Sequence, residues 1–237
     1  MPIKRPPIVT GEIYHIVIKA VEGTKLFLDK KDYLRMIHDL FVFNNEDSAP
    51  VNYRKQNSRG IDVSRTVLDT LKRKLLVEIW AFCLMPNHVH LLIKQLKDGG
   101  ISKFMRKIGA GYGGYYNRKY KRNGHLLQGK YHIIHIKNDK QLMTVFVYIH
   151  TNPVAVFIPN WKEKGIKGRE LQKIIKFLED YRWSSYPDYL GKKNFPSLTS
   201  REFLLKEIGG IKNSQRFIND WLQTKKELAD FEEVAIE

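Results

Sequence analysis

Two histidines, His88 and His90, lie one residue apart in the apolar stretch "AFCLMPNHVHLLIK". If this stretch contains a β-strand, both side chains project from the same face, about 7 Å apart at Cα. Two imidazoles at that spacing can share one divalent cation. A half-exposed strand face that carries two histidines by chance explains so short a pattern equally well. The next residue on that face, Leu92, is not a ligand, so a metal site requires a further ligand from elsewhere in the chain.

A second set of residues that could do chemistry lies in the segment "DKQLMTVFVYIHTNPV". Its apolar residues recur at helical spacing, and Pro153 ends the pattern because proline cannot continue a helix. Tyr148 and Asn152 are four residues apart, so they share a helix face, which we expect at the margin of the apolar stripe and next to a surface. Asn152 could supply a third metal ligand and Tyr148 a nucleophile. Helix termination before proline and edge packing with the hydroxyl in water are the ordinary explanations of these two residues.

The elements that must position these side chains follow from hydrophobic periodicity and turn residues. Strands are predicted over residues 10–20, 75–85, 88–95 and 130–137. Helices are predicted over residues 29–43, with Asp29 as the cap, and over 101–120, 139–152, 169–181, 200–208 and 214–230. Residues 44–74 are polar and rich in turn formers, which indicates an insertion or loop with a short helix at 63–72. The strand at 75–85 is expected to be buried on both faces.

The order strand, helix, strand, strand, helix, strand, helix is typical of an α+β protein with an antiparallel sheet. We therefore predict a ferredoxin-like (split βαβ) antiparallel sheet with helices on one face, plus a helical C-terminal extension. The expected domains are residues 1–194, with 44–74 as the insertion, and a helical extension over 195–237. The role of that extension stays open.

Composition narrows the class of partner. The chain has 237 residues, of which 43% are hydrophobic, and 41 basic against 25 acidic side chains give a net charge of +16. Such a charge is most easily tolerated beside a polyanion, and nucleic acid is the first candidate, ahead of an anionic membrane surface. The only cysteine, Cys83, excludes an intramolecular disulfide and a cysteine-based zinc cluster. No signal peptide or membrane span is predicted, so we expect a cytoplasmic protein without a membrane partner.

Four spaced blocks carry a resemblance to a known family: "WAFCLMPNHVHLLIK", "GGYYNRKYKRNGHLLQGKYH", "VYIHTNPV" and "YRWSSYPDYL". In this order they resemble the single-tyrosine HUH transposases, and most of all the REP-associated tyrosine transposases. The stretch "GEIYHIVIKAVEGTKLFLDKKDY" is similar to the opening strand and helix of the same family. The resemblance covers roughly residues 11–190, and it is more specific than any single motif because the four blocks agree.

The resemblance implies a site and a reaction. His88 and His90 match the two metal-binding histidines, Asn152 matches the helix-borne third ligand, and Tyr148 matches the nucleophile. The family cleaves single-stranded DNA near hairpins and rejoins it through a 5′-phosphotyrosine intermediate, with Mg²⁺ or Mn²⁺. The resemblance therefore implies a metal-dependent DNA transposase whose partner is single-stranded or hairpin DNA. It leaves open whether the protein is a monomer or a homodimer.

Basic residues that follow the matched histidines are expected to contact DNA phosphates. They are Lys103, Arg106, Lys107, Arg118, Lys119, Arg122, Lys130 and Lys137. Tyr112, Tyr115 and Tyr116 could stack on unpaired bases, although helix packing is the more ordinary explanation of them, and Trp183 and Tyr186 are expected to close the core.

Two other functions stay open on the sequence. A non-catalytic nucleic-acid-binding module on the same fold would use the same charge and aromatic residues, but it does not require the two histidines and the Tyr148–Asn152 pair. A metal-dependent phosphodiesterase could use activated water instead, with Tyr148 only positioning the substrate.

Overall fold

The computed structural model describes residues 7–47, 73–159, 161, 166 and 168–223. Its centre is a four-stranded antiparallel sheet with the strand order β2-β3-β1-β4. The strands are β1 (Ile13–Lys19), β2 (Val77–Met85), β3 (His88–Gln95) and β4 (His132–Ile136). All four predicted strands are present, and β2 is buried along nearly its whole length as expected.

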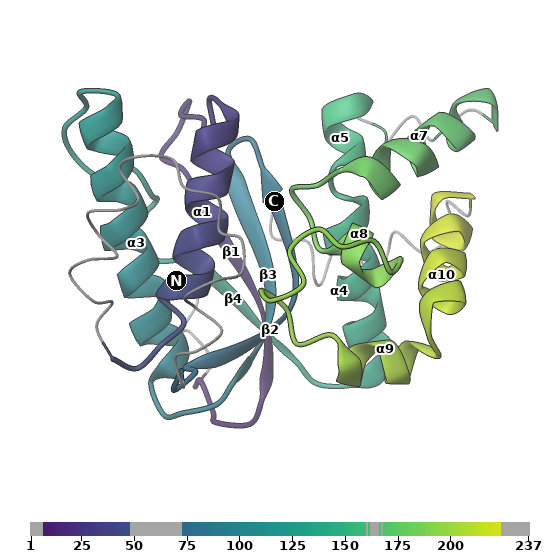
Figure 1. Ribbon diagram of the computed structural model, residues 1–237, viewed down its shortest axis with the longest axis horizontal. Helices are drawn as coiled ribbons and strands as arrows, with labels where there is room; N and C mark the ends of the chain where they lie inside the picture. Colours follow the sequence, from purple (N-terminus) through teal and green to yellow (C-terminus); the bar gives the residue numbers. More distant parts are fainter. Residues whose placement is uncertain (1–6, 48–72, 160, 162–165, 167, 224–237) are drawn as a thin grey trace, which may run out of the picture.

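Two helices cover one face of this sheet, α1 (Lys30–Val42) and α3 (Gly100–Lys119) (Figure 1). Asp29 is the predicted cap of α1, and it forms a capping box in which the Asp32 backbone N–H donates to its side chain. Helix α3 continues through its glycines. At Gly111 a side chain would overlap the ring of Phe43, so glycine lets α3 lie close to the end of α1.

The opposite face of the sheet is covered by α4, and the helices that follow it in the chain lie on the same side (Figure 1). The helices there are α4 (Asp139–Thr151), α5 (Val154–Phe157), α7 (Gly168–Asp180), α8 (Tyr186–Tyr189), α9 (Glu202–Ile208) and α10 (Ile211–Gln223). The expected placement of helices on one face therefore holds for α1 and α3, whereas α4 lies on the other face. The predicted helix at 63–72 and the end of the one predicted over 214–230 lie outside the described residues.

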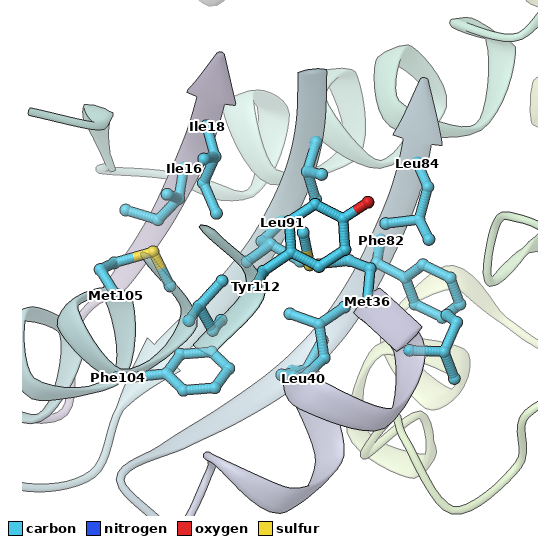
Figure 2. Close-up of a cluster of buried hydrophobic side chains, with 14 of the residues drawn as sticks. Ile16, Ile18, Met36, Leu40, Phe82, Leu84, Leu91, Phe104, Met105 and Tyr112 are labelled. Atoms are coloured by element: carbon cyan, nitrogen blue, oxygen red, sulfur yellow. The ribbon is translucent and has the colours of Figure 1, made fainter. Parts of the chain in front are cut away.

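Each face of the sheet has its own hydrophobic core. The first core joins β1, β2 and β3 to α1 and α3, as Figure 2 shows for Ile16, Leu91, Met36 and Phe104. The second joins the other face of the sheet to α4, α7, α8, α9 and α10. Because strand residues alternate between faces, Leu91 enters the first core and Leu92 the second. The second core includes residues from both predicted domains, and the extension covers the outer side of α4.

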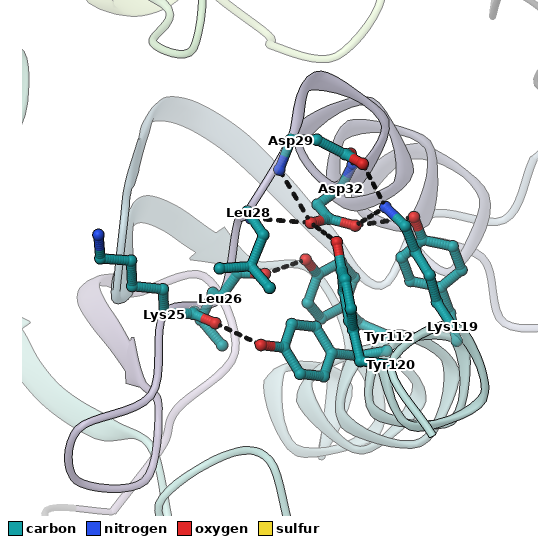
Figure 3. A network of polar contacts seen from close by, with 10 residues as sticks. Lys25, Leu26, Leu28, Asp29, Asp32, Tyr112, Lys119 and Tyr120 are labelled. Carbon is teal, nitrogen blue, oxygen red and sulfur yellow. Dashed lines mark hydrogen bonds and ion pairs between the residues drawn. The ribbon is translucent and has the colours of Figure 1, made fainter. Parts of the chain in front are cut away.

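A buried carboxylate joins the two helices of the first face (Figure 3). The side chain of Asp32 is fully buried, and its oxygens accept five hydrogen bonds. The donors are the backbone N–H groups of Leu28 and Asp29, the hydroxyls of Tyr115 and Tyr120, and the ammonium of Lys119. Burial alone would raise the pKa of Asp32, but these donors outweigh it and leave the pKa below its ordinary value.

None of the helices formed by the described residues is long and apolar enough to span a membrane.

Candidate active site

His90 is the centre of a buried polar cluster between the sheet and α4. Its Nδ1 lies 3.0 Å from Nε2 of His15 on β1, and its Nε2 lies 2.9 Å from Nδ2 of Asn152 at the end of α4. The Tyr148 ring meets the His90 ring edge-on, with 5.4 Å between centroids. The exposed fractions of His90, Tyr148 and Asn152 are 0%, 1% and 2%. Three residues that were predicted from the sequence to form one site therefore lie close together in space, within a single chain.

The register of the sheet explains this convergence. His88 and His90 lie on the face of β3 that looks toward α4, and their ring centroids are 4.7 Å apart with the planes almost perpendicular. β1 runs antiparallel to β3, with Val17 opposite His90 and His15 opposite Leu92. His15 is thus the diagonal neighbour of His90 on the same face, which is within reach of a side-chain contact.

Helix α4 is fixed against the sheet by another buried histidine, His150. Nε2 of His150 lies 2.7 Å from the hydroxyl of Ser185, and that hydroxyl also accepts the backbone N–H of Phe82 on β2. Burial lowers the pKa of His150 to about 3, so its ring is neutral at physiological pH. This contact connects α4 to the sheet between Tyr148 and Asn152, and it therefore holds both residues in place.

The hydrogen bonds of the two histidines of β3 fit a metal-binding tautomer. With the Asn152 amide in this orientation its Nδ2 can only donate, so Nε2 of His90 accepts and Nδ1 of His90 carries the proton; the reverse amide orientation, which accepts from an Nε2–H, fits the same distances. In the same way Oδ1 of Asn87 can only accept, so Nδ1 of His88 donates to it across 2.7 Å. In this tautomer both histidines have an unprotonated Nε2, which is the form that binds a metal ion.

The donor set fits a small divalent cation. The described residues contain no group of three or more His, Cys, Asp or Glu side chains placed to hold a metal ion. Two imidazoles and one amide are a different set, and they are present here in His88, His90 and Asn152. Because the two orientations of an amide occupy the same space, Asn152 can turn its oxygen toward the position that its Nδ2 now occupies. These ligands are neutral, so the bound cation would keep its full charge.

A cleft of about 680 Å³ borders His88, the half-buried member of the set. Lys19, Lys25, Asn87 and Gln128 are among its lining residues. Lys19 pairs directly with His88 in the sheet register, so the cleft has a cation beside the imidazole. Of the proposed site residues the cleft borders only His88, and its two lysines outnumber its one carboxylate, that of Glu22, so its charge suits an anionic substrate.

Comparison with known proteins gives a consistent result. Residues 49–152, somewhat less than half of the chain, match the family model described as "Transposase IS200 like". The chain resembles an IS200-like transposase. The matched segment contains His88, His90 and Tyr148 and ends at Asn152, so it includes all four residues predicted to form the active site. The resemblance predicted from the sequence is therefore confirmed at the level of the family.

A solved structure supports the fold. It is described as "Structure of the REP associates tyrosine transposase bound to a REP hairpin". The two chains share 14% sequence identity, the match covers 85% of this chain and 93% of that chain, and the TM-score is 0.50. The search of curated proteins found no significant match. The likeness between this chain and the REP-associated transposase confirms the predicted α+β fold with its antiparallel sheet.

One expectation about this transposase-like site is wrong. Tyr148 and Asn152 were expected next to a surface, but both are buried. The reason is that α4 has a packed neighbour on each side, because Tyr148 meets His15 and His90 on the sheet whereas Phe146 meets Tyr189 of α8. A helix packed on both sides has no exposed margin at these positions.

The predicted DNA-contacting residues fall into two groups. Three of them bind within the protein: Lys107 donates to backbone carbonyls of 45–47, Lys119 to Asp29 and Asp32, and Arg122 to the 124–125 carbonyls. Arg106 and Lys130 line a hollow of about 820 Å³ beside α3. Arg118 and Lys137 are exposed, and Lys103 is half-buried. The structural roles of the first group weigh against them as DNA contacts.

The aromatic residues behave as packing residues. Tyr112 and Tyr116 donate their hydroxyls to the backbone carbonyls of Leu26 and Lys25, and Tyr115 donates to Asp32. The packing explanation of these tyrosines is therefore confirmed. Tyr186 is fully buried and Trp183 packs against the first core, as expected for residues that close the core.

His15 is the member of the cluster that sequence reasoning missed. It lies outside the segment that matches the family model. The alternation in "IYHIVIK" places His15 and Val17 on one strand face, which is the signal that could have found it. Without the register between β1 and β3, however, nothing connects that face to His90.

Proposed function

We propose that this protein is a DNA-cleaving transposase that cuts and rejoins single-stranded DNA near hairpins through a covalent bond between Tyr148 and the 5′ phosphate. The observation that supports this most is the convergence of His90, Asn152 and Tyr148 from β3 and α4 of one chain. The family match over the same residues supports it independently.

The reaction follows from the residue types. The oxygen of Tyr148 attacks the scissile phosphorus, a phosphorus–oxygen bond to tyrosine forms, and the bond to the 3′ oxygen breaks. The phenol proton is lost to a base, and the departing 3′ oxygen takes up a proton and becomes a 3′ hydroxyl. Because one phosphodiester replaces another, the bond energy is conserved and a 3′ hydroxyl can later reverse the step.

His88, His90 and Asn152 would hold Mg²⁺ or Mn²⁺, which when bound neutralises charge on the phosphate. The residues of the chain do the rest. His90 and Asn152 position their donor atoms within a buried layer between sheet and helix, and Lys19 and Lys25 add positive charge along the cleft. The net charge of +16 would draw a polyanion toward the surface.

The geometry also favours a site built by a single chain. α4 packs against its own sheet and shares a hydrophobic core with α8, α9 and α10. Tyr148 therefore reaches His90 without help from a second copy. A homodimer stays a prediction, but in this proposal the nucleophile acts within its own chain.

A non-catalytic binding module is the second candidate, and the cluster weighs against it. Buried imidazole and amide groups oppose folding unless each is hydrogen-bonded. Apolar residues in the same layer would stabilise the fold without that requirement. A module that binds DNA on its surface gains nothing from this buried cluster. A metal-dependent phosphodiesterase that uses water accounts for His88 and His90, and it differs from our proposal only in the role of Tyr148.

The test is incubation of the full chain with labelled single-stranded hairpin DNA and Mn²⁺, followed by a denaturing gel. We expect a covalent protein–DNA adduct from the wild type and none from Tyr148→Phe, with hairpin binding retained. Tyr189→Phe is the matched control, because it removes another buried hydroxyl on the same side of the sheet, the one that donates to the Trp80 carbonyl. Cleavage by Tyr148→Phe at the wild-type rate would instead favour the water mechanism.

A further inference from the structure

We propose that His15 is a positioning residue that holds His90 in the orientation and tautomer required to bind the metal ion. This inference rests on the proposed function, and it adds a residue outside the set of two histidines, tyrosine and asparagine.

His15 is placed for that role by the sheet. Its side chain is fully buried, and its Nε2 lies 3.0 Å from Nδ1 of His90. The two rings are stacked, with centroids 5.2 Å apart and planes 20° from parallel. A fully buried histidine in contact with a second one is an unusual use of a strand position that an apolar residue could fill. The contact therefore needs an explanation beyond packing.

The chemistry of the contact supplies that explanation. With its proton on Nδ1, His90 donates to Nε2 of His15, and its own Nε2 keeps the lone pair that a cation needs. A metal-binding imidazole commonly donates its other N–H to a nearby acceptor, which fixes the tautomer and the ring and makes the ligand nitrogen more basic. In this site the acceptor is a neutral imidazole nitrogen in place of a carboxylate or carbonyl.

Removal of the acceptor would favour the wrong tautomer. A buried N–H without a partner destabilises the form that contains it. His90 can avoid this penalty by moving its proton to Nε2 and donating to the oxygen of a reoriented Asn152 amide, which faces it at 2.9 Å. In that tautomer Nε2 carries hydrogen and cannot bind a metal ion. His15 thus selects between a metal-binding and a non-binding form of the same cluster.

His15 also contacts the nucleophile. Its ring meets the Tyr148 ring edge-on at 5.8 Å between centroids. One buried side chain therefore touches the metal ligand His90 and the nucleophile Tyr148. A change at this position can alter the spacing between ligand and nucleophile, although His15 itself touches neither metal nor DNA in the proposal.

Two substitutions separate the acceptor from the packing. His15→Gln puts an amide oxygen close to the former position of Nε2 and keeps an acceptor for His90. His15→Phe keeps a ring of similar shape and loses the acceptor. Both are compared with the wild type in thermal unfolding. If His15→Phe does not fold, His15→Met, which also lacks the acceptor and adapts its shape, replaces it.

The first measurement is metal-free and independent of activity. Long-range ¹H–¹⁵N spectra of the histidine rings report which nitrogen of His90 carries the proton. We expect Nδ1–H in the wild type and in His15→Gln, and a shift toward Nε2–H in His15→Phe. The second measurement is Mn²⁺ titration of the full chain by calorimetry, in which we expect His15→Phe to bind about 10- to 100-fold more weakly and His15→Gln to stay close to the wild type.

The outcomes distinguish this inference from the proposed function. If the wild type binds Mn²⁺ and His15→Phe shows the same tautomer and the same affinity, His15 is only a packing residue and the inference is wrong, whereas the Tyr148→Phe experiment still stands. Loss of affinity in His15→Gln as severe as in His15→Phe would also overturn it, because the acceptor would then not be what matters. A wild-type chain that does not bind Mn²⁺ overturns the metal site itself.

Discussion

The two faces of the sheet each contain a buried polar cluster, and the clusters differ in kind. On the face of α1 and α3, the carboxylate of Asp32 accepts five hydrogen bonds from donors within the protein. On the face of α4, two imidazole rings and an amide form a chain from His15 through His90 to Asn152. The first cluster contains a carboxylate with a full set of donors, whereas the second consists of imidazoles and an amide and lies next to a cleft at His88.

This difference distinguishes a buried polar cluster that stabilises the fold from one that can take part in a reaction. A buried carboxylate with an ammonium partner and a full set of donors stabilises one arrangement of two helices. Its partner Lys119 has a raised pKa, because hydrogen bonds to Asp29 and Asp32 outweigh the effect of burial. A chain of imidazoles can instead change tautomer and accept a ligand. We therefore expect substitutions in the first cluster to alter stability and substitutions in the second to alter chemistry.

The largest expected effect is on cleavage, from His90→Ala. Loss of a metal ligand removes several kcal/mol of charge stabilisation, so we expect adduct formation to fall by about 1,000-fold or more. Chelation of divalent ions with EDTA should have a comparable effect on the wild type. Hairpin binding should persist in both cases, because affinity comes mainly from phosphate contacts. Undiminished adduct formation in EDTA would show that no metal ion takes part.

Asp32→Ala should have the converse effect. It removes the charge that partners Lys119 and leaves five donors without their acceptor, and breaking such a buried pair typically destabilises a protein by about 3 kcal/mol or more. Equilibrium urea unfolding measures this loss. Adduct formation per folded molecule should stay near the wild-type value, since Asp32 is on α1 and Tyr148 is on α4, on opposite sides of the sheet (Figure 1). A specific loss of cleavage in folded Asp32→Ala would break the proposed division between the two faces.

The Asp32 cluster also predicts a pH dependence. The pKa of Asp32 is lowered in the folded chain, so the unfolded chain binds the proton more readily. Its contribution to stability is complete above the ordinary pKa of about 4 and is lost as the pH falls through the lower folded value. Urea unfolding at a series of pH values should show a steeper acid loss for the wild type than for Asp32→Asn. Equal slopes would mean that Asp32 is not the carboxylate responsible.

Much of the fold could be predicted from the sequence because it depends on local signals. Alternation and the Met-Pro-Asn turn define β2 and β3, Asp29 defines the start of α1, and Pro153 defines the end of α4. Helices α5 and α8 were missed because four-residue helices have almost no periodicity. The face that α4 occupies was missed because an apolar stripe does not indicate which side of a sheet it covers.

The candidate site was predictable only in part, for a related reason. His88, His90, Tyr148 and Asn152 have informative spacing within their own elements. His15 depends on the register between β1 and β3, and the structural role of Lys119 depends on the packing of α1 against α3. Long-range pairing of this kind is not encoded in local spacing, so a list of basic residues could not separate those that bind DNA from those that bind Asp32.

The smallest expected effect distinguishes two lysines by their surroundings. Lys19 lines the cleft beside His88, whereas the ammonium of Lys107 donates to carbonyls of 45–47, among them that of Asp47 at 2.9 Å. If Lys19 contacts one phosphate of a single strand, Lys19→Gln should reduce the salt dependence of hairpin binding by about 0.7 in the log–log slope. Lys107→Gln should leave that slope unchanged and lower the free energy of unfolding instead. Binding titrations at several salt concentrations measure the slope. If the slope changes for Lys107→Gln and not for Lys19→Gln, the DNA lies along α3 and not in the cleft. The slope reports how many counterions leave the DNA when lysine ammonium groups take their place at the phosphates, so only a lysine that contacts DNA can change it.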